Sequence, residues 1–167
     1  YLYNIKQIEK IYVADVNSIS AKKFASHFDD RVEGLKLDIR DFEILKSEMS
    51  KVDIVVNTTG PFFLFAEPIL KAAIQTNTHY FDICDDWEPT EKMLQMNEDA
   101  KKANITAIIG LGASPGLTNI LAHMAISELD EVRKVYTGWD MSAAKPESES
   151  SQSGVSAAMV HGIEPVS

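Results

Sequence analysis

The chain has 167 residues, of which 45% are hydrophobic and 8% aromatic, enough for one domain with a sizeable core. Its net charge of −9 and the lack of any Lys/Arg cluster argue against nucleic acid as a partner. The single cysteine, Cys84, excludes an intrachain disulfide framework and fits a reducing compartment. No apolar run approaches the roughly 18 residues of a membrane span, and no signal-peptide pattern opens the chain. We therefore expect a cytoplasmic protein with no membrane partner.

Apolar runs alternate with helical patterns along most of the chain. The runs typical of buried strands span residues 11–15, 32–38, 53–58, 79–83 and 105–110. Helical spacing or a helix-start signal follows each run: at 20–28, after Asp41, from Glu67 and Pro68, at about 89–103, and after Ser114. Strands joined by helices pair in parallel through right-handed crossovers. The sequence therefore predicts an α/β fold with a doubly wound, Rossmann-like parallel sheet.

A different texture begins near residue 132. Val135, Thr137 and Trp139 alternate with other residues, and residues 146–153 form a polar stretch. We interpret residues 1–131 as a dinucleotide-binding domain and 132–167 as the incomplete start of a second domain. The polar stretch is then either a plain linker or a substrate loop of that second domain.

Two acids end the first two predicted strands, at the edge where open α/β sheets bind ligands. Asp15 is a candidate partner for the adenosine ribose hydroxyls, because such an acid follows a glycine-rich turn by about 20 residues. Counting back places that turn before Tyr1, and the alternative for Asp15 is an ordinary loop acid. Asp38 is a candidate for the adenine edge of the cofactor, or a plain turn acid. No arginine adjoins Asp15 to hold a 2′-phosphate, although Lys22 and Lys23 are near, so the sequence leans to NAD over NADP.

The third strand ends in a more specific motif, Asn57-Thr58-Thr59-Gly60-Pro61. A strand that ends in small polar residues and glycine lets a flat ligand approach the backbone closely. Asn and Thr offer donors and acceptors for a ribose or a nicotinamide amide. We interpret these five residues as cofactor-binding, and a tight structural turn is the alternative.

The fourth strand ends in a crowd of acids. Clustered carboxylates at a ligand edge can supply a general acid or base, or bind a substrate amine, which makes Asp82 and Asp85 candidates. The alternatives are helix capping for Asp85 and Asp86 and a core position for Tyr80. The pattern around Cys84 favours a small buried residue rather than a nucleophile. The four histidines show no metal-ligand spacing, so we expect no metal site.

The last predicted strand leads into a glycine-rich loop, Gly110-Leu111-Gly112-Ala113-Ser114-Pro115-Gly116. Ser114 as N-cap and Pro115 at the first helical position would explain much of it structurally. The surplus glycines suggest that a ligand packs there. A nicotinamide carboxamide or a substrate carboxylate would suit the free N–H groups of a helix start, so Gly112, Ser114, Pro115 and Gly116 join the cofactor-binding candidates.

Three blocks resemble the saccharopine dehydrogenase-like family: residues 55–62, residues 78–82, and residues 110–119, from Gly110-Leu111-Gly112 to Leu117-Thr118-Asn119. Their order and spacing match over most of the chain, from about Ile11 to Trp139. The resemblance implies a Rossmann cofactor domain, followed by a mixed α+β domain that builds the substrate site and often the dimer contact. Both the glycine-rich turn and most of that second domain would be missing here.

The resemblance also implies an activity. Family members reduce an imine or oxidise an amine at the carbon–nitrogen bonds of amino acids and related compounds, using NAD or NADP. Tyr80, Asp82 and residues 114–116 would lie near the reacting centre, and we name Tyr80, Asp82 and Asp85 as catalytic candidates. Saccharopine reductases commonly have Asp in place of Ser114 and an acid near Asn119, which points to a different amine or imine substrate.

One rival function stays open, and the sequence argues against a second. A non-catalytic dinucleotide-sensing or scaffold module would keep the fold without the chemistry. A short-chain alcohol or sugar-nucleotide enzyme needs a Tyr-x-x-x-Lys pair, and no tyrosine of this chain has lysine four residues on.

Overall fold

The computed structural model describes residues 2–138, and its strands all pair in parallel. A short 3-10 turn, η1 (Leu2–Asn4), precedes the first strand. The five strands are β1 (Ile11–Asp15), β2 (Val32–Lys36), β3 (Ile54–Asn57), β4 (His79–Asp82) and β5 (Ala107–Ile108). Each connection between consecutive strands contains at least one helix, as the alternating pattern predicts.

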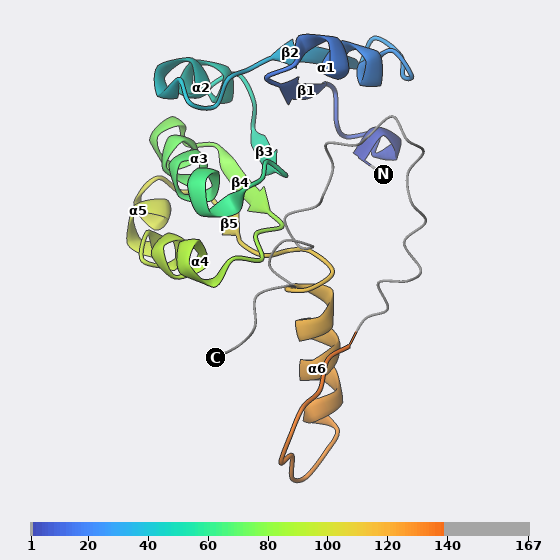
Figure 1. The fold of residues 1–167 in the computed structure, drawn as a ribbon, viewed down its shortest axis with the longest axis vertical. Helices are drawn as coiled ribbons and strands as arrows, with labels where there is room; N and C mark the ends of the chain where they lie inside the picture. The colour runs from blue at the N-terminus through green and yellow to red at the C-terminus, as the bar shows by residue number, and fades with distance from the viewer. Residues whose placement is uncertain (1, 139–167) are drawn as a thin grey trace.

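The helices between the strands are α1 (Ser18–Ala25), α2 (Phe42–Met49), α3 (Phe62–Thr76), α4 (Trp87–Leu94) and α5 (Asn97–Lys102). A further helix, α6 (Leu117–Ser127), follows β5 and projects away from the rest of the domain (Figure 1). The predicted N-cap Asp41 is confirmed, because its carboxylate accepts the Ile44 N–H at 3.1 Å.

The strands form two sheets, with the orders β1-β2 and β3-β4-β5. Figure 1 shows α1 beside the first sheet and α3, α4 and α5 on one side of the second. Parallel strands with flanking helices confirm the predicted Rossmann-like α/β architecture. Within the described residues, β1 pairs only with β2 and β3 only with β4, so each of these strands has one unpaired edge.

The main core lies between α2, α3, α4 and the second sheet. Helix α3 buries the stripe Phe62, Ala66, Ile69, Leu70 and Ala73, at the spacing of one helical face. Leu45 and Met49 of α2, Tyr80 of β4 and Met93 of α4 belong to the same buried cluster. This core fixes the carboxyl ends of β3 and β4, where the candidate ligand residues follow.

Some predicted boundaries are wrong. Helix α3 begins at Phe62 rather than at Glu67, and Pro68 lies inside it, because the buried stripe extends to both sides of the proline. The predicted helix 89–103 is two helices, α4 and α5, separated at Gln95 and Met96. The domain boundary at 131/132 stays a prediction, and residues 146–153 lie outside the described residues.

Candidate functional site

The carboxyl ends of β3, β4 and β5 lie side by side and carry the predicted ligand motifs. Asn57, the last residue of β3, is the register partner of Asp82, the last residue of β4, and Phe81 pairs with Ile108 of β5. Each strand end continues into a segment singled out in the sequence: residues 57–61, 82–86 and 110–116. The topology therefore brings the three motifs to one edge of the sheet.

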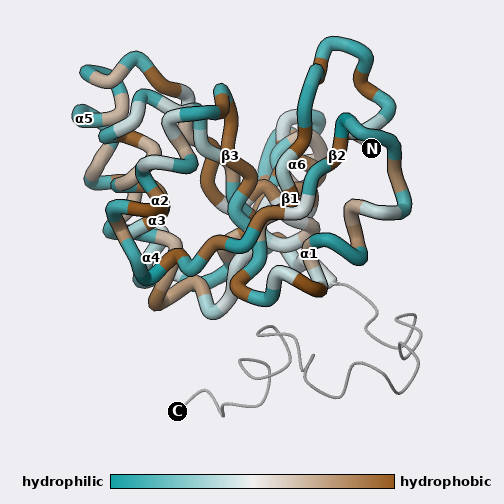
Figure 2. Tube along the Cα trace, turned by 90° about the horizontal axis from the view of Figure 1, so that it is seen from above, coloured by the Kyte–Doolittle hydropathy of each residue, from teal (hydrophilic) through white to brown (hydrophobic). Residues whose placement is uncertain are grey.

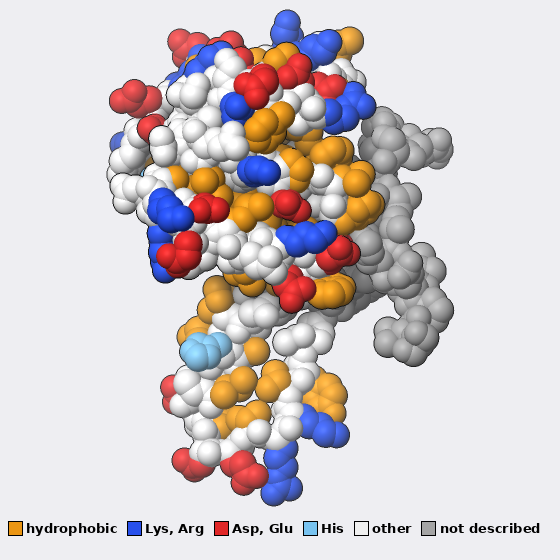
Figure 3. Space-filling model, turned by 90° about the vertical axis from the view of Figure 1, so that its left-hand side faces the viewer, with side chains coloured by type: hydrophobic (Ala, Val, Ile, Leu, Met, Phe, Trp, Pro, Cys, Tyr) orange, Lys and Arg blue, Asp and Glu red, His pale blue; other side chains and the backbone are white. Residues whose placement is uncertain are grey.

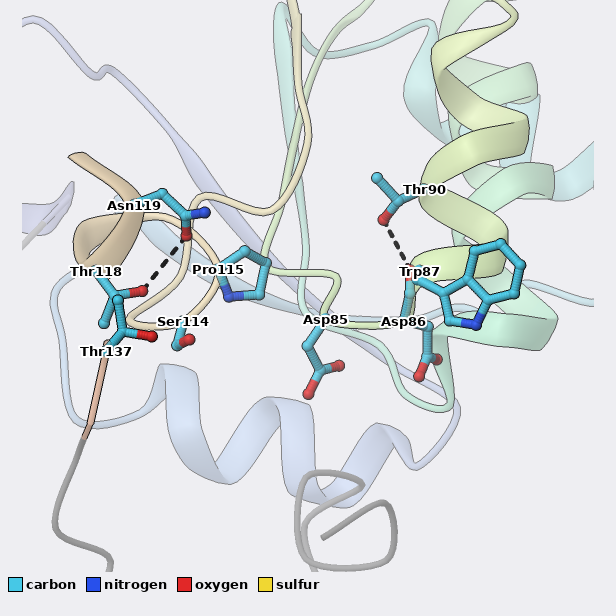
Figure 4. A pocket seen from close by; sticks show the side chains of 9 residues that line it. All are labelled: Asp85, Asp86, Trp87, Thr90, Ser114, Pro115, Thr118, Asn119 and Thr137. Carbon is cyan, nitrogen blue, oxygen red and sulfur yellow. Dashed lines mark hydrogen bonds between the residues drawn. The ribbon is translucent and has the colours of Figure 1, made fainter. Parts of the chain in front are cut away.

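A pocket of about 370 Å³ opens beside the second and third of these segments. Its lining residues are Asp85, Asp86, Trp87, Thr90, Ser114, Pro115, Thr118, Asn119 and Thr137. In Figure 4, Asp85 lies between Ser114 and Pro115 on one side and Asp86 and Trp87 on the other. The described residues of the lining include two carboxylates and no Lys, Arg or His, so their charge favours a cationic or amine-bearing ligand.

The glycine-rich loop closes on itself before α6 begins. The Gly112 N–H donates to the Pro115 carbonyl at 3.0 Å, and the Leu117 N–H donates to the Gly112 carbonyl at 2.9 Å. The predicted N-cap Ser114 is therefore wrong: the N-cap is Gly116, whose φ is +118° and whose N–H donates to Asn119 Oδ1 at 3.0 Å. Because Ser114 and Pro115 belong to the loop instead, their side chains are available to line the pocket.

Asp82 and Tyr80 lie beneath this surface rather than on it. Tyr80 is 0% and Asp82 1% exposed, and the Tyr80 hydroxyl donates to Asp82 Oδ2 at 2.7 Å. Burial, followed by the neighbouring Asp82 carboxylate, raises the pKa of Tyr80 far above its ordinary value, although the hydrogen bond from Asn57 opposes the shift. Neither residue lines the pocket. Their catalytic role therefore stays a prediction.

The other two acids of the same segment have different surroundings. Asp86 precedes α4, and its Oδ2 accepts the Phe63 N–H at 3.0 Å, at the start of α3. Asp86 holds the N-cap position of α4, as the capping alternative has it, but its side chain makes no cap hydrogen bond to that helix. Its carboxylate stabilises the N-terminal end of α3 instead. Asp85 is exposed and faces the pocket. Asp85 is therefore the predicted catalytic candidate that a ligand in this pocket can reach.

Cys84 is fully buried, as expected for a small apolar residue. Burial raises the pKa of its thiol, the opposite of what a nucleophilic cysteine needs. Among residues 2–138, no group of three or more His, Cys, Asp or Glu side chains could hold a metal ion. No helix in the same range has the length and apolar character to cross a membrane.

The adenosine-side candidates lie at the ends of the other sheet. Asp15 is exposed at the end of β1 and accepts the Asn17 N–H at 2.7 Å, and Asn17 in turn caps α1. Asp38 follows β2 and forms a two-pronged ion pair with Arg40, at 2.8 Å and 2.6 Å. The Arg40 guanidinium lowers the pKa of Asp38 to about 2. Neither acid lines the pocket.

Residues 58–60 present an open surface where the cofactor is expected. Thr58, Thr59 and Gly60 are exposed, and a Cβ added at Gly60 would meet no atom within 4 Å. Packing in the described residues thus gives no reason for glycine at this position. Close approach of a ligand to the backbone would explain the glycine, so this edge fits a nucleotide cofactor.

Four pocket residues were not anticipated from sequence: Trp87, Thr90, Thr118 and Thr137. Trp87 directly follows Asp85-Asp86, and Thr118 belongs to the motif block 110–119, so their neighbours could have suggested both. Thr137 had no such signal. It reaches the pocket because the segment after α6 runs back along that helix (Figure 1).

A family model, the saccharopine dehydrogenase NADP binding domain, matches residues 2–108. The chain belongs to this NADP-binding domain family. It is 27% identical, over 120 residues, to "Saccharopine dehydrogenase [NADP(+), L-glutamate-forming]" of Pyricularia oryzae, covering 72% of this chain and 25% of the relative.

A solved structure has the same fold. It is the apo, histidine-tagged saccharopine dehydrogenase (L-Glu forming) from Saccharomyces cerevisiae, with a TM-score of 0.61 and 22% identity. The match covers 71% of this chain and 25% of that one. The chain thus spans about a quarter of the length of these relatives.

The lean to NAD is not supported. The family model is that of an NADP-binding domain, and the relative from Pyricularia oryzae is named for NADP(+). No arginine adjoins Asp15, but Lys22 and Lys23 lie near it in the sequence. Ser18 and Ser20 lie in the first turn of α1, three and five residues after that acid, and their hydroxyls can also bind phosphate.

Proposed function

We propose that this chain is the cofactor-binding part of an NADP-dependent oxidoreductase acting at a carbon–nitrogen bond of an amino acid or related amine or imine. The observation that carries the proposal is a family match to an NADP-binding domain, combined with an acidic pocket at the carboxyl ends of its strands. We further propose that the full protein is a cytoplasmic homodimer, as is common for such enzymes.

The pocket supports an amine-bearing substrate. An ammonium or iminium group carries positive charge, and Asp85 is an exposed carboxylate facing the pocket. The indole of Trp87, 76% exposed, offers an aromatic face for the same charge. Ser114, Thr118 and Thr137 add hydroxyl groups that can donate to or accept from the substrate.

The positions of these groups suggest a separate role for each in the proposed reaction. The NADP cofactor, when bound, supplies or accepts the hydride. The open edge at Thr58, Thr59 and Gly60 would hold its nicotinamide side. Asp85 would bind the substrate amine and take or return its proton, and the loop 110–116 would bound the space in which the amine sits.

The test is turnover by the protein that contains this chain. Oxidation of amines with NADP, and reduction of the corresponding imines with NADPH, are measured over amino acids, saccharopine and polyamine-related compounds. We expect NADP-dependent turnover on at least one amine and a lower rate with NAD. Tight NADP binding without turnover in either direction would contradict the proposal and favour a dinucleotide-sensing module with the same fold.

A further inference from the structure

A network of hydrogen bonds, buried from Asn57 to Gly110, crosses the carboxyl edge of the second sheet. The Thr59 N–H donates to Asn57 Oδ1 at 2.9 Å, and Asn57 Nδ2 donates to the Tyr80 hydroxyl at 3.1 Å. The Tyr80 hydroxyl donates to Asp82 Oδ2 at 2.7 Å. Asp82 Oδ1 accepts two N–H groups, from Cys84 at 3.0 Å and Gly110 at 2.7 Å. These hydrogen bonds thus connect the 57–61 turn with Gly110, the first residue of the loop 110–116, which we call the pocket loop.

The register explains why these side chains meet. Asn57 and Asp82 are register partners in parallel strands, and Tyr80 precedes Asp82 by two residues, so all three lie on one face of the sheet. That face is buried: Asn57 is 3% exposed and the other two less. Water therefore cannot easily replace a lost partner of Asn57, Tyr80 or Asp82, whereas it can reach the Thr59 N–H at the exposed end of the network.

Asp82, at one end of this network, determines which group donates and which accepts in the hydrogen bonds from Asp82 to Thr59. A carboxylate has acceptors only, so Asp82 obliges the Tyr80 hydroxyl to donate its single proton. The Tyr80 oxygen is then left to accept, which turns the NH₂ end of the Asn57 amide toward it. The oxygen end of the same amide therefore faces the Thr59 N–H.

We propose that Asp82 is a positioning residue that orients the 57–61 turn at a distance, through Tyr80 and Asn57, while holding the pocket loop at Gly110. The turn on the cofactor side and the loop on the amine side are then set by one hydrogen-bonded unit. The expected effect on NADPH binding rests on the proposed function, whereas the coupling of Asp82 to the 57–61 turn through hydrogen bonds does not.

The decisive substitution is Asp82→Asn, which keeps the shape and changes one acceptor into a donor. The Cys84 and Gly110 N–H groups still need an acceptor, so the oxygen of the new side-chain amide faces them and its NH₂ group faces Tyr80. The Tyr80 proton must then turn to Asn57, whose amide rotates and leaves the Thr59 N–H without an acceptor. We expect Thr59 amide exchange to accelerate about fivefold, the equivalent of one net hydrogen bond, with Gly110 unchanged.

Amide exchange and chemical shifts, measured by NMR on the 167-residue chain, give the readout. Asp53→Asn, just before β3 and outside the network, is the matched control and should leave Thr59 unchanged. In a Tyr80→Phe background, Asp82→Asn should no longer affect Thr59, because the middle link is gone. An unchanged Thr59 amide in Asp82→Asn, or an equal change in both backgrounds, would overturn the coupling.

A measurement without any substitution covers the case in which Asp82→Asn does not fold. In the wild-type chain, the Asn57 side-chain NH₂ protons should show nuclear Overhauser contacts to the Tyr80 ring. Contacts from these protons to the Thr59 amide instead would mean the opposite amide orientation and would overturn the proposal.

The functional arm uses the protein that contains this chain. Asp82→Asn should weaken NADPH binding about fivefold, although Asp82 lies beneath the surface, while Asp53→Asn leaves it unchanged. Unchanged NADPH affinity together with a perturbed Thr59 amide would overturn the link to the cofactor. Absence of NADPH binding in the wild type would instead count against the proposed function, and the NMR result would still decide the coupling.

Discussion

Gly60 is the single residue that distinguishes the two explanations of the 57–61 motif, a tight structural turn and a cofactor-binding turn. A glycine kept for packing or for a left-handed backbone shows a blocked Cβ position or a positive φ, as Gly116 does. Gly60 shows neither, since its Cβ position is open space. Its side of the turn is therefore free for a ligand to approach.

We expect Gly60→Ala to leave the free energy of unfolding unchanged or to raise it by up to about 1 kcal/mol, because alanine restricts the unfolded chain. NADPH binding should weaken, because the added methyl group occupies the approach to the backbone. Thermal unfolding and NADPH titration measure the two effects. Gly138→Ala, at another glycine with open surroundings, is the control. Equal NADPH affinity in both variants would show that the cofactor does not contact this turn.

Asp38 gives a pH prediction at the same scale. Its pKa is lowered to about 2 by Arg40, against roughly 3.9 in an unfolded chain. A carboxyl whose pKa is lower in the folded state stabilises the fold fully above the unfolded pKa, and this stabilisation is lost as pH falls toward 2. The effect is small, since Arg40 is largely exposed.

Carbon NMR titration of the Asp38 carboxyl should give a midpoint near 2 in the wild type. In Arg40→Gln the midpoint should rise toward the ordinary value, because the guanidinium is the main cause of the shift. Lys46→Gln, which removes a positive charge from an i,i+3 pair with Glu43, is the control and should leave the midpoint in place. The same midpoint in Arg40→Gln and the wild type would contradict the ion pair.

The sequence could predict which residues lie at strand ends, because strand ends depend on local pattern. It could not predict whether those residues are buried or exposed. Asp82 and Asp85 are three residues apart and looked equivalent in the sequence. The structure buries Asp82 because it is the register partner of Asn57 and accepts the Gly110 N–H from a segment 28 residues away. Those are long-range contacts that no local spacing contains.

At the scale of elements, α3 shows packing overriding a local signal. The sequence favours a helix that starts at Glu67 with Pro68 in its first turn, the usual place for proline. The structure instead begins the helix at Phe62, because Phe62 and Ala66 extend the buried stripe. Pro68 itself is exposed.

Pro68→Ala should therefore stabilise the chain. Alanine restores an N–H inside the helix and removes the ring, which we expect to raise the free energy of unfolding by about 1–3 kcal/mol. Urea unfolding followed by circular dichroism measures the change. Lys71→Ala, in the same helix and also exposed, is the control for helix propensity. A loss of stability in Pro68→Ala would mean that the proline suits this backbone.

The whole molecule leaves several apolar surfaces uncovered. Ile54 and Val56 of β3 are 53% and 49% exposed, unusual for a strand of a doubly wound sheet, and Figure 2 shows hydrophobic segments along β3. No residue of α6 is buried, and Figure 3 shows hydrophobic side chains exposed on the projecting lobe. The alternating pattern predicted the parallel pairing, but it carried no information on these uncovered faces.

Exposed strand edges promote association between chains. We expect the 167-residue chain to self-associate as its concentration rises, and Ile54→Lys to reduce this association. Sedimentation velocity over a concentration series measures it. Ile19→Lys, at another exposed isoleucine located on α1 rather than on an unpaired strand, is the control. Equal association of both variants would assign the contact to another surface, such as α6.

The assignment of this pocket to the substrate amine is tested most directly by the KM for the amine of Asp85→Asn, measured in the protein that contains this chain. Asp85 faces the pocket, and loss of a charge-assisted hydrogen bond should raise the KM for the amine about tenfold. NADPH affinity should stay the same, and Asp30→Asn, an exposed acid remote in sequence and absent from the pocket lining, should change neither. An amine KM that is identical in Asp85→Asn and the wild type would contradict the assignment of this pocket to the amine.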